Sequence, residues 1–454
     1  MNPVETNTLV IGAGSIGIAV AYYLKKHAPA LDVILVDCDQ PMAFTSAQSG
    51  ENYRNWWPNP MMRAFTDRSI DLMEEIARDS DNVLQMTRRG YVLATRRTNI
   101  DDHLMELDAG YKGSVENQIR MHDTALGTKY QPAASENWQE APSGVDIIAD
   151  KSLIQNVFPY FDKEIRSVIH IRRAGMISGQ QMGQYMLQAF RAAGGARLTG
   201  KVDDLSCDGR FLVELDGGTQ SIRADRVVNA AGPFVGELSV KLGIELPVEN
   251  WLQQKIAFED TKRTIDRTMP FAIDLDPQQL DWDDDERRIL AEDPDFAWLA
   301  EQLPGAIHCR PEGGDNGTWL KLGWAYNQSS APVSFTPSFD DQFPEIVLRG
   351  AARLNPALKA YYGQLPRSMV HYGGFYTLTD ENWPLLGPTE LEGFFVAGAL
   401  SGFGTMAACA SGELLAQHIL GAKLPDYADM LSPMRYQNPE MVTQMRAQQS
   451  RGIL

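Results

Sequence analysis

The sequence predicts an α/β chain in which a Rossmann-like dinucleotide-binding domain is interleaved with a discontinuous α+β domain on a mixed sheet. Two observations carry this prediction. An apolar strand enters a glycine-rich turn and then a helix at residues 9–17, and a second strand and glycine turn occupies residues 393–406. Between them, helical stretches alternate with short strands, which is typical of interleaved α/β and α+β units.

The N-terminal glycines are spaced for binding a pyrophosphate. Gly12 allows a tight turn, Gly14 lets the phosphates approach the backbone, and Gly17 lets the helix pack against the strand. The next strand, 32–36, ends in Asp37, which lies 20 positions after Gly17, where a ribose-binding acid is expected. We therefore predict an adenine dinucleotide site that also includes Ser15, Ile16 and Cys38.

The C-terminal glycine turn indicates which dinucleotide is bound. A nicotinamide enzyme needs no second cradle of this type, whereas FAD extends its isoalloxazine ring toward a second helix N-terminus. Between the two turns, strand 225–229 closes on a third turn of small residues. The pattern predicts FAD, with contacts in the second and third turns from Gly402, Phe403, Gly404, Thr405, Met406, Ala230 and Gly232.

These three motifs, in this order and spacing, resemble the FAD-dependent oxidoreductases of the D-amino acid oxidase and sarcosine oxidase superfamily. The resemblance covers most of the chain and implies a glutathione reductase-type FAD fold. Residues 45–58 lie where members of that superfamily pass the chain along the flavin. The cofactor contacts expected in this segment are Thr45, Ser46, Ser49, Gly50 and Arg54. The resemblance also implies contacts from Val202 and Gly374.

The predicted elements divide the chain between two domains. Helices are expected at 61–78, 179–193 and 407–420, and strands at 90–94, 196–198, 211–215 and 254–258. We assign residues 1–86, 151–242 and 371–454 to the FAD-binding domain. Residues 87–150 and 243–370 form the substrate domain, with an acidic insertion near 274–295. Ten acidic residues predict an exposed helical insertion there, whereas Trp282 and Trp298 leave a lid or an oligomer contact as the alternative.

Composition excludes some functional classes. The formal charge of −18, from 41 basic and 59 acidic residues, argues against binding a phosphate backbone. The four cysteines include no C-x-x-C pair, so reduced thiols are expected rather than disulfides or a metal site. No apolar run approaches the roughly 20 residues that span a bilayer, and no signal peptide is recognised. A cytoplasmic enzyme is expected; an oligomer is possible.

Lys321 is the candidate for oxygen activation. Residues 317–324 are similar to the G-x-x-L-K-L-G-Y stretch of monomeric sarcosine oxidases, whose lysine lies over the flavin. A positive charge there stabilises superoxide as it forms. Leu320 and Leu322 should face one side of a strand and Lys321 the other. The alternative is a solvent-facing lysine on a half-buried strand.

Two further residues complete the predicted catalytic set. Arg54 resembles an arginine that approaches the isoalloxazine, and Tyr376 matches a stretch that places a tyrosine hydroxyl near the substrate. A surface ion pair for Arg54 and a core position for Tyr376 are the alternatives. His308 and His371 are the histidines near these motifs. Each is a candidate base, and a position in the core is the alternative.

Two departures from the sarcosine oxidases limit the substrate. The lysine that binds the carboxylate is replaced by Met406, and the cysteine that anchors the flavin by Gly374, so FAD should be noncovalent. Arg173, Arg310 and Arg367 are the candidate partners for a substrate carboxylate, with a structural role as the alternative for each. The leading hypothesis is oxidation of a C–N bond in an amino acid or secondary amine, with oxygen as acceptor. The alternatives are an amine or 2-hydroxy-acid dehydrogenase using a quinone or other carrier, and a non-catalytic flavin subunit.

Overall fold

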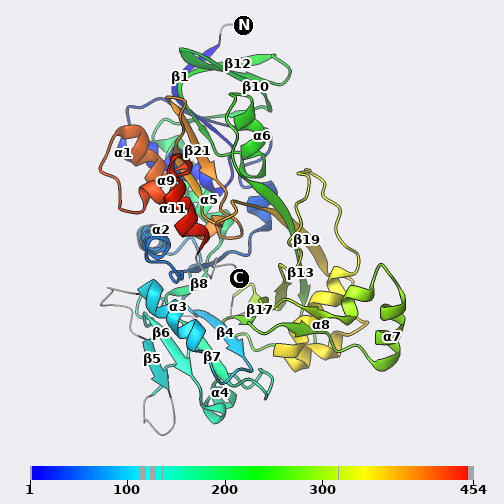
Figure 1. The fold of residues 1–454 in the computed structure, drawn as a ribbon. Helices are drawn as coiled ribbons and strands as arrows, with labels where there is room; N and C mark the ends of the chain where they lie inside the picture. The colour runs from blue at the N-terminus through cyan, green and yellow to red at the C-terminus, as the bar shows by residue number, and fades with distance from the viewer. Residues whose placement is uncertain (1–2, 112–118, 123–128, 134–137, 315, 448–454) are drawn as a thin grey trace.

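The computed structural model describes residues 3–111, 119–122, 129–133, 138–314 and 316–447. Two large sheets organise these residues, one in the upper half of Figure 1 and the other mainly in the lower half. Parts of the expected segments 87–150 and 371–454 lie outside the described residues.

The first sheet has eight strands around a parallel centre. Its path is β10-β11-β12-β1-β2-β9, with β21 beside β12 and β20 beside β21. Strand β1 pairs in parallel with both β12 and β2, the arrangement of a Rossmann-like sheet. The strands are β1 (Val4–Ile11), β2 (Val33–Asp37), β9 (Ala196–Thr199), β10 (Val202–Asp208), β11 (Arg210–Leu215), β12 (Gln220–Asn229), β20 (Leu385–Pro388) and β21 (Phe394–Gly398).

Four long helices pack together beside this sheet. They are α1 (Ser15–His27), α2 (Pro60–Asp79), α5 (Gly179–Ala192) and α9 (Gly404–Leu420), and α1 packs most extensively against α9. A Cβ at Gly412 would lie 2.5 Å from the carbonyl carbon of Ala19, so the two backbones approach too closely for any larger residue. This contact fixes α1 and α9, the two helices that begin at the glycine turns.

The second sheet has nine strands of mixed direction. Its order is β19-β13-β18-β17-β14-β4-β7-β6-β5, and helix α8 (Phe343–Leu354) packs on β13, β17 and β18. The mixed α+β architecture expected for the second part of the chain is therefore present. The strands are β4 (Tyr91–Thr95), β5 (Ile119–His122), β6 (Val145–Ile148), β7 (Ser167–Ile171), β13 (Glu249–Glu259), β14 (Phe271–Asp274), β17 (Ile307–Glu312), β18 (Trp319–Gly323) and β19 (Val370–Leu378).

Shorter elements complete the described fold. They are the ribbons β3 (Asn52–Arg54) with β8 (Ala174–Met176) and β15 (Gln278–Gln279) with β16 (Gln302–Leu303), and the helices α3 (Asp101–Tyr111), α4 (Lys151–Val157), α6 (Val235–Val240), α7 (Asp284–Glu292), α10 (Ala428–Leu431) and α11 (Pro439–Arg446). The helices expected near 61–78, 179–193 and 407–420 correspond to α2, α5 and α9.

Two strands join a different sheet from the one that the expected domain boundaries imply. Residues 151–242 and 371–454 were expected with the first sheet, but β7 pairs with β4 and β6, and β19 pairs with β13. All five residues of β7 are buried, so its sequence has no exposed face to indicate which sheet it joins. The rest of the domain division stays a prediction.

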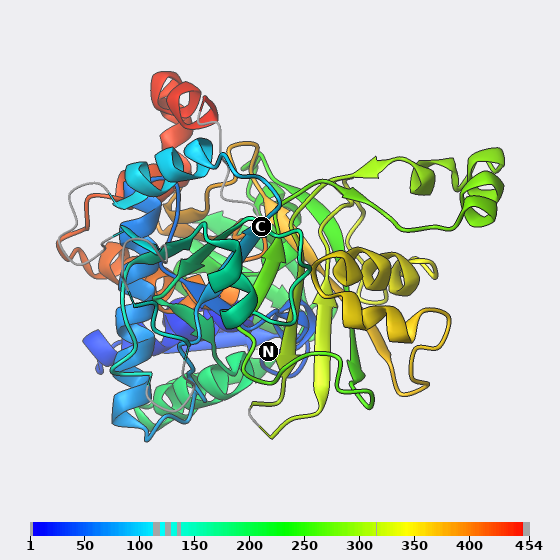
Figure 2. The same cartoon turned by 90° about the horizontal axis from the view of Figure 1, so that it is seen from below.

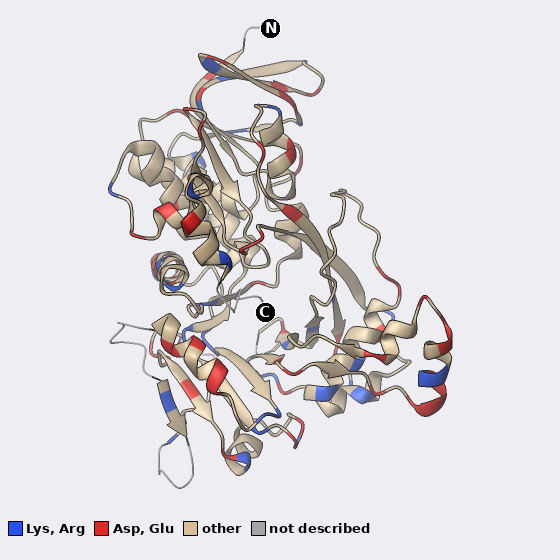
Figure 3. Cartoon of the chain, in the orientation of Figure 1, with Lys and Arg blue, Asp and Glu red and all other residues tan. Residues whose placement is uncertain are grey.

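The acidic insertion forms a helical arm. Helix α7 extends away from the body of the molecule (Figure 2). Its acidic residues are coloured red in Figure 3. A capping box between Asp283 and Glu286 starts the helix. Arg349 of α8 ties the arm down, because its guanidinium lies 4.0 Å from the centroid of the Trp282 ring and forms an ion pair with Glu286 at 2.9 Å.

The remaining observations concern membrane-spanning helices and the cysteines. Within the described ranges, no helix combines the length and apolar character that crossing a bilayer requires. The four cysteines are free: Cys309 and Cys409 are buried, and Cys38 and Cys207 are exposed.

Candidate active site

Gly12 and Gly17 of the first glycine turn leave no space for a side chain, and Gly14 lies close to the Ser46 hydroxyl. Gly12 has a φ of +105°, and a Cβ there would lie 2.3 Å from the carbonyl oxygen of Ala230. A Cβ at Gly17 would lie 1.8 Å from the carbonyl oxygen of Gly12, and one at Gly14 would lie 2.9 Å from Ser46 Oγ. Helix α1 begins at Ser15 after Gly14, which has no side chain to cap it. The Ser15 amide donates a hydrogen bond to Ser46 Oγ at 3.1 Å, so a hydroxyl lies where the N-terminus of α1 can receive an anion.

One cavity lies beside this turn, at the ends of β1 and β2. It is lined by Gly12, Gly14, Asp37, Cys38, Val202 and Gly232, among others. Asp37 Oδ2 accepts a hydrogen bond from the Ala13 amide at 2.5 Å, which ties the end of β2 to the glycine turn. This first cavity fits the adenosine half of a dinucleotide.

A second cavity continues toward α9. It shares Gly14, Thr45, Ser46, Ala230 and Gly232 with the first cavity and ends at Gly402, Gly404 and Thr405. Ser49 Oγ and Thr405 Oγ1 are 2.7 Å apart, which joins the segment after β2 to the start of α9. No described side chain caps α9 either. Ala399 and Ser401 have positive φ, an uncommon conformation that shapes the turn.

Most predicted cofactor residues line these two cavities. Gly17, Arg54, Phe403 and Met406 are the exceptions; Gly17 packs under the turn and the other three line a third cavity. The two cavities, together the nucleotide channel, share glycine-rich lining and reach the N-termini of α1 and α9, which suits an extended dinucleotide. The residues present therefore fit FAD. The predicted residues that line these cavities and would hold it are Gly12, Gly14, Ser15, Ile16, Asp37, Cys38, Thr45, Ser46, Ser49, Gly50, Val202, Ala230, Gly232, Gly374, Gly402, Gly404 and Thr405.

The third cavity adjoins the flavin end of the channel. Its residues combine aromatic rings with cations, in a form suited to a small polar molecule. It shares with the second cavity Ser49, Gly50, Lys255, Tyr376, Ser401, Gly402 and Thr405. It adds Glu51, Asn52, Arg54, Tyr91, Phe271, His308, Asn382, Phe403 and Met406.

Arg54 is buried in this third cavity rather than on the surface. Its side chain is 4% exposed, and its guanidinium lies 5.3–5.9 Å from the centroids of the Trp56, Trp57 and Tyr91 rings. Burial lowers the pKa of Arg54 to about 10, so it remains a cation at neutral pH. The surface ion pair considered from the sequence does not fit this position.

Tyr376 faces the boundary between the second and third cavities. A Cβ at Gly402 would lie 2.6 Å from its ring, so glycine is needed for this close contact. Burial raises the pKa of Tyr376 to about 12, which keeps the hydroxyl protonated and able to donate a hydrogen bond. Its position suits an interaction with a bound substrate.

Lys321 is buried and paired. It is 9% exposed, so the solvent-facing alternative does not apply. Its Nζ lies 3.1 Å from Glu312, and it is not among the described residues that line the three cavities. Burial and the nearby Arg310 lower the pKa of Lys321 to about 8, although Glu312 acts in the opposite direction. The oxygen-activating role stays a prediction.

Lys255 is a lysine that the sequence interpretation missed. It lies on β13 and lines both the second and the third cavity. Register pairs Ala257 with Lys321, so Lys255, two residues earlier, is on the same face of the sheet as Lys321. A single lysine between Gln254 and the apolar Ile256 in a buried strand was the available signal.

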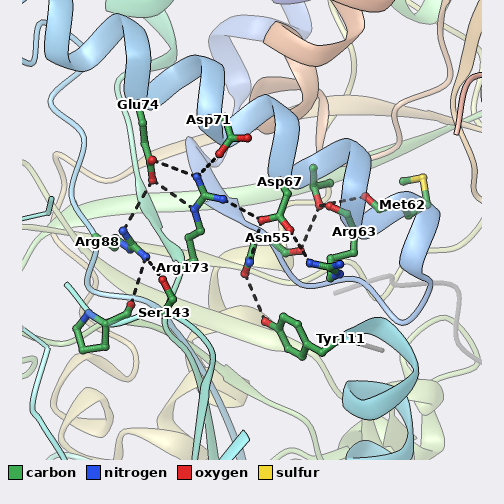
Figure 4. A network of polar contacts seen from close by, with 12 residues as sticks. Asn55, Met62, Arg63, Asp67, Asp71, Glu74, Arg88, Tyr111, Ser143 and Arg173 are labelled. Atoms are coloured by element: carbon green, nitrogen blue, oxygen red, sulfur yellow. Dashed lines mark hydrogen bonds and ion pairs between the residues drawn. The ribbon is translucent and has the colours of Figure 1, made fainter. Parts of the chain in front are cut away.

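Arg173 is committed elsewhere. Figure 4 shows it reaching three carboxylates of α2: Asp67 at 3.0 Å, Asp71 at 2.6 Å and Glu74 at 3.0 Å. Arg88 lies 3.8 Å from Glu74 in the same network. Arg173 therefore ties α2 to the β7–β8 turn and does not bind a substrate carboxylate.

Two other arginines proposed for that carboxylate also lie outside the lining of the third cavity, as far as the described residues show. Arg310 forms an ion pair with Glu312 at 2.7 Å and donates a hydrogen bond to the Gly50 carbonyl at 2.9 Å. Arg367 is exposed. Neither position supports a direct contact with the substrate.

The two candidate histidines differ in position. His371 lies 2.9 Å from Gln254 Oε1 and stacks on Phe343, as expected for a core histidine. His308 lines the third cavity. Burial and the nearby charge of Lys255 lower the pKa of His308 to about 3, so its ring is neutral at pH 7. It is therefore a weak base.

Comparison with known families now defines the class of protein. A family described as FAD dependent oxidoreductase, DAO, matches residues 7–418. The chain belongs to this family of flavin oxidoreductases, as its motifs predicted. Human mitochondrial dimethylglycine dehydrogenase is 21% identical over 464 residues, which covers 99% of this chain and 46% of that protein. The chain thus spans about half the length of this relative.

Solved structures share the fold over nearly the whole chain. L-proline dehydrogenase from P. horikoshii has a TM-score of 0.70 at 17% identity, covering 96% of this chain and 99% of that one. Glycine oxidase from Geobacillus kaustophilus has a TM-score of 0.68 at 15% identity, covering 95% and 99%. The predicted α/β fold is confirmed.

Proposed function

We propose that this protein oxidises the C–N bond of an amino acid or a secondary amine, with noncovalent FAD as cofactor and oxygen as electron acceptor. One observation carries the proposal: the flavin end of the nucleotide channel opens into the aromatic, cationic third cavity through shared residues such as Tyr376 and Lys255. A flavin bound there would supply the hydride acceptor for the donor carbon.

The chain supplies binding, orientation and exclusion of water. The Tyr376 hydroxyl can donate a hydrogen bond to a substrate carboxylate or to the lone pair of an amine. Tyr91 and Phe271 provide apolar walls to the cavity. Because its pKa is about 3, His308 cannot hold the proton of an ammonium group near neutral pH. We therefore propose that the substrate releases its ammonium proton to the solvent as it enters the cavity, because desolvation disfavours the charged form.

A substrate screen tests the reaction class. Holoenzyme would be assayed for hydrogen peroxide with N-methyl amino acids, D- and L-amino acids, polyamines and 2-hydroxy acids. A parallel anaerobic series would use a quinone as acceptor. We expect peroxide with at least one amine or amino acid. Turnover restricted to 2-hydroxy acids would contradict the proposal.

A dehydrogenase is the second candidate, because Lys321 is paired with Glu312. A cation whose charge is partly balanced at 3.1 Å does less to stabilise developing superoxide. Electrons would then pass to a quinone or another carrier, and amine turnover would appear only in the quinone series. No turnover in either series by flavin-loaded protein would favour a non-catalytic flavin subunit.

FAD should be released completely when the protein is denatured. Gly374 offers no side chain for a covalent bond, and a Cβ there would already lie 3.1 Å from Gln48 Cβ. Acid precipitation of the yellow protein should leave all flavin in the supernatant, where chromatography should identify FAD. Flavin that remains with the washed pellet would contradict noncovalent binding.

A further inference from the structure

Lys255 is a buried cation that the proposed reaction leaves without a role. Strand β13 places Ile256 and Phe258 in the core beneath α8, and so directs Lys255 to the opposite face. Lys255 is 5% exposed. Its Nζ lies 3.4 Å from the Gln48 carbonyl oxygen and 5.7 Å from the centroid of the Tyr376 ring.

Lys255 differs from the other cations on this sheet face in its ion-pair partners. Among the described residues, no aspartate or glutamate forms an ion pair with it, whereas Lys321 and Arg310 both have Glu312. Burial alone lowers the pKa of Lys255, to about 8, so most molecules still carry the charge at pH 7. A buried ammonium group without a counter-ion is unfavourable, and an arriving anion would stabilise it.

The charges that line the third cavity indicate how many negative charges the anion should carry. Arg54 and Lys255 contribute two positive charges to its lining, and Glu51 contributes one negative charge. Glu51 Oε1 accepts the amide hydrogen bond of Gly179 at 2.9 Å. Lys255 is the lining cation whose ion-pair partner is missing among the described residues, and a neutral amine with a single carboxylate would balance its one charge.

Position distinguishes Lys255 from Arg54 as the anchor. The guanidinium of Arg54 lies among the rings of Trp56, Trp57 and Tyr91, and Arg54 lines only the third cavity. Lys255 lines both that cavity and the flavin end of the channel. An anion held at Lys255 would stay at the boundary where the two cavities meet.

We propose that Lys255 binds the carboxylate of the substrate. This inference rests on the proposed function and narrows it, because it selects an amino acid with one free carboxylate over a simple amine or a polyamine. Lys255 is then a specificity-determining residue, contributed by β13 of the second sheet.

Acetate is a direct probe of this site, and acetamide is its uncharged match. Acetate binding to oxidised holoenzyme would be followed as a change in the flavin absorption spectrum. Lys255→Met should raise the Kd for acetate about 10- to 100-fold, as expected for the loss of one hydrogen bond to a charged group. Lys255→Arg should restore most of the affinity for acetate. Acetamide should bind wild type and every variant more weakly than acetate binds wild type.

The pH dependence gives a second readout. Only the protonated lysine attracts ionised acetate, so the affinity should be highest at about pH 6 to 7 and fall as the pH rises through about 8. The other groups at this face are Tyr376, Tyr372, His308, Arg54, Arg310, Glu51, Glu312 and Lys321. Of these, Lys321 also has a pKa of about 8, so Lys321→Met is the matched control. It should keep the pH dependence, and Lys255→Met should abolish it.

Three outcomes would overturn this assignment. Unchanged acetate affinity in Lys255→Met would do so, and so would loss of affinity in Arg54→Gln alone. Slower reoxidation of Lys255→Met with normal acetate affinity would assign Lys255 to oxygen instead. Equal FAD content and thermal unfolding would show that each variant is folded, with Lys255→Gln as a second substitution if Lys255→Met loses flavin.

Acetate binding does not require turnover, so the two proposals can fail separately. If acetate binds through Lys255 but no amine is oxidised, the proposed reaction fails and the carboxylate site stands. If only amines without a carboxylate are oxidised, the reaction class stands and the role of Lys255 is refuted.

Discussion

Gly14→Val should yield protein that contains no FAD after purification. Gly14 lines both nucleotide cavities, and even an ideal Cβ there lies 2.9 Å from Ser46 Oγ. The two methyl groups of valine would fill the space through which the pyrophosphate reaches the N-terminus of α1. The measurement is flavin content by absorbance, followed by titration of the apoprotein with FAD.

A graded substitution separates this effect from misfolding. Gly14→Ala adds only the Cβ, which the rotatable Ser46 hydroxyl can partly accommodate, so weakened but measurable FAD binding is expected. Circular dichroism should show the same secondary structure for both variants and wild type. Thermal unfolding of Gly14→Val should match that of wild-type apoprotein, because bound ligand stabilises only the form that binds it. Stoichiometric FAD in Gly14→Val would mean that the turn is only structural.

The nucleotide channel could be predicted because its information is local. Gly12, Gly14 and Gly17 belong to one strand–turn–helix unit, and Asp37 ends the adjacent strand. Each glycine meets a backbone or side-chain atom within the same region of the structure, so spacing alone specifies the turn. Gly402, just before α9, differs, because its close contact is the Tyr376 ring of β19, whereas a Cβ at Gly404 would meet no described atom closer than 3.9 Å.

The substrate side could be predicted only in part, because long-range pairing places its residues. The alternation of Leu320, Lys321 and Leu322 indicated correctly that Lys321 differs in orientation from its neighbours, and both leucines are fully buried. The sequence could not show that β17 brings Glu312 to Lys321, since that requires the register between β17 and β18.

Two other residues illustrate the same limit. Arg173 was a reasonable carboxylate partner until α2 supplied three acidic residues to it. Lys255 belongs to no sequence motif. It becomes part of a cavity because residues of β3, β13 and β19 line the same space and β13 pairs with β19. Contacts of this kind depend on tertiary packing that local patterns do not contain.

Lys321→Met should slow reoxidation of the reduced holoenzyme by oxygen, on the order of a hundredfold or more if its effect resembles the loss of one oxyanion donor. A lysine ammonium stabilises developing superoxide but contributes little to hydride transfer from the substrate. Anaerobic reduction by an oxidisable substrate should therefore change far less. Stopped-flow absorbance measures the two half-reactions separately.

The pH profile and a matched variant decide whether Lys321 is the cation that matters. Its pKa of about 8 predicts that wild-type reoxidation is fastest below pH 8 and declines as the pH rises and the ammonium loses its proton. Glu312 keeps Arg310 as a partner at 2.7 Å, so removing Lys321 leaves no unpaired carboxylate.

Lys255→Met, on the same sheet face, should leave reoxidation within a fewfold of wild type. Equal losses in both half-reactions of Lys321→Met would indicate a positional role. Unchanged reoxidation would make Lys321 a structural partner of Glu312 and favour the dehydrogenase.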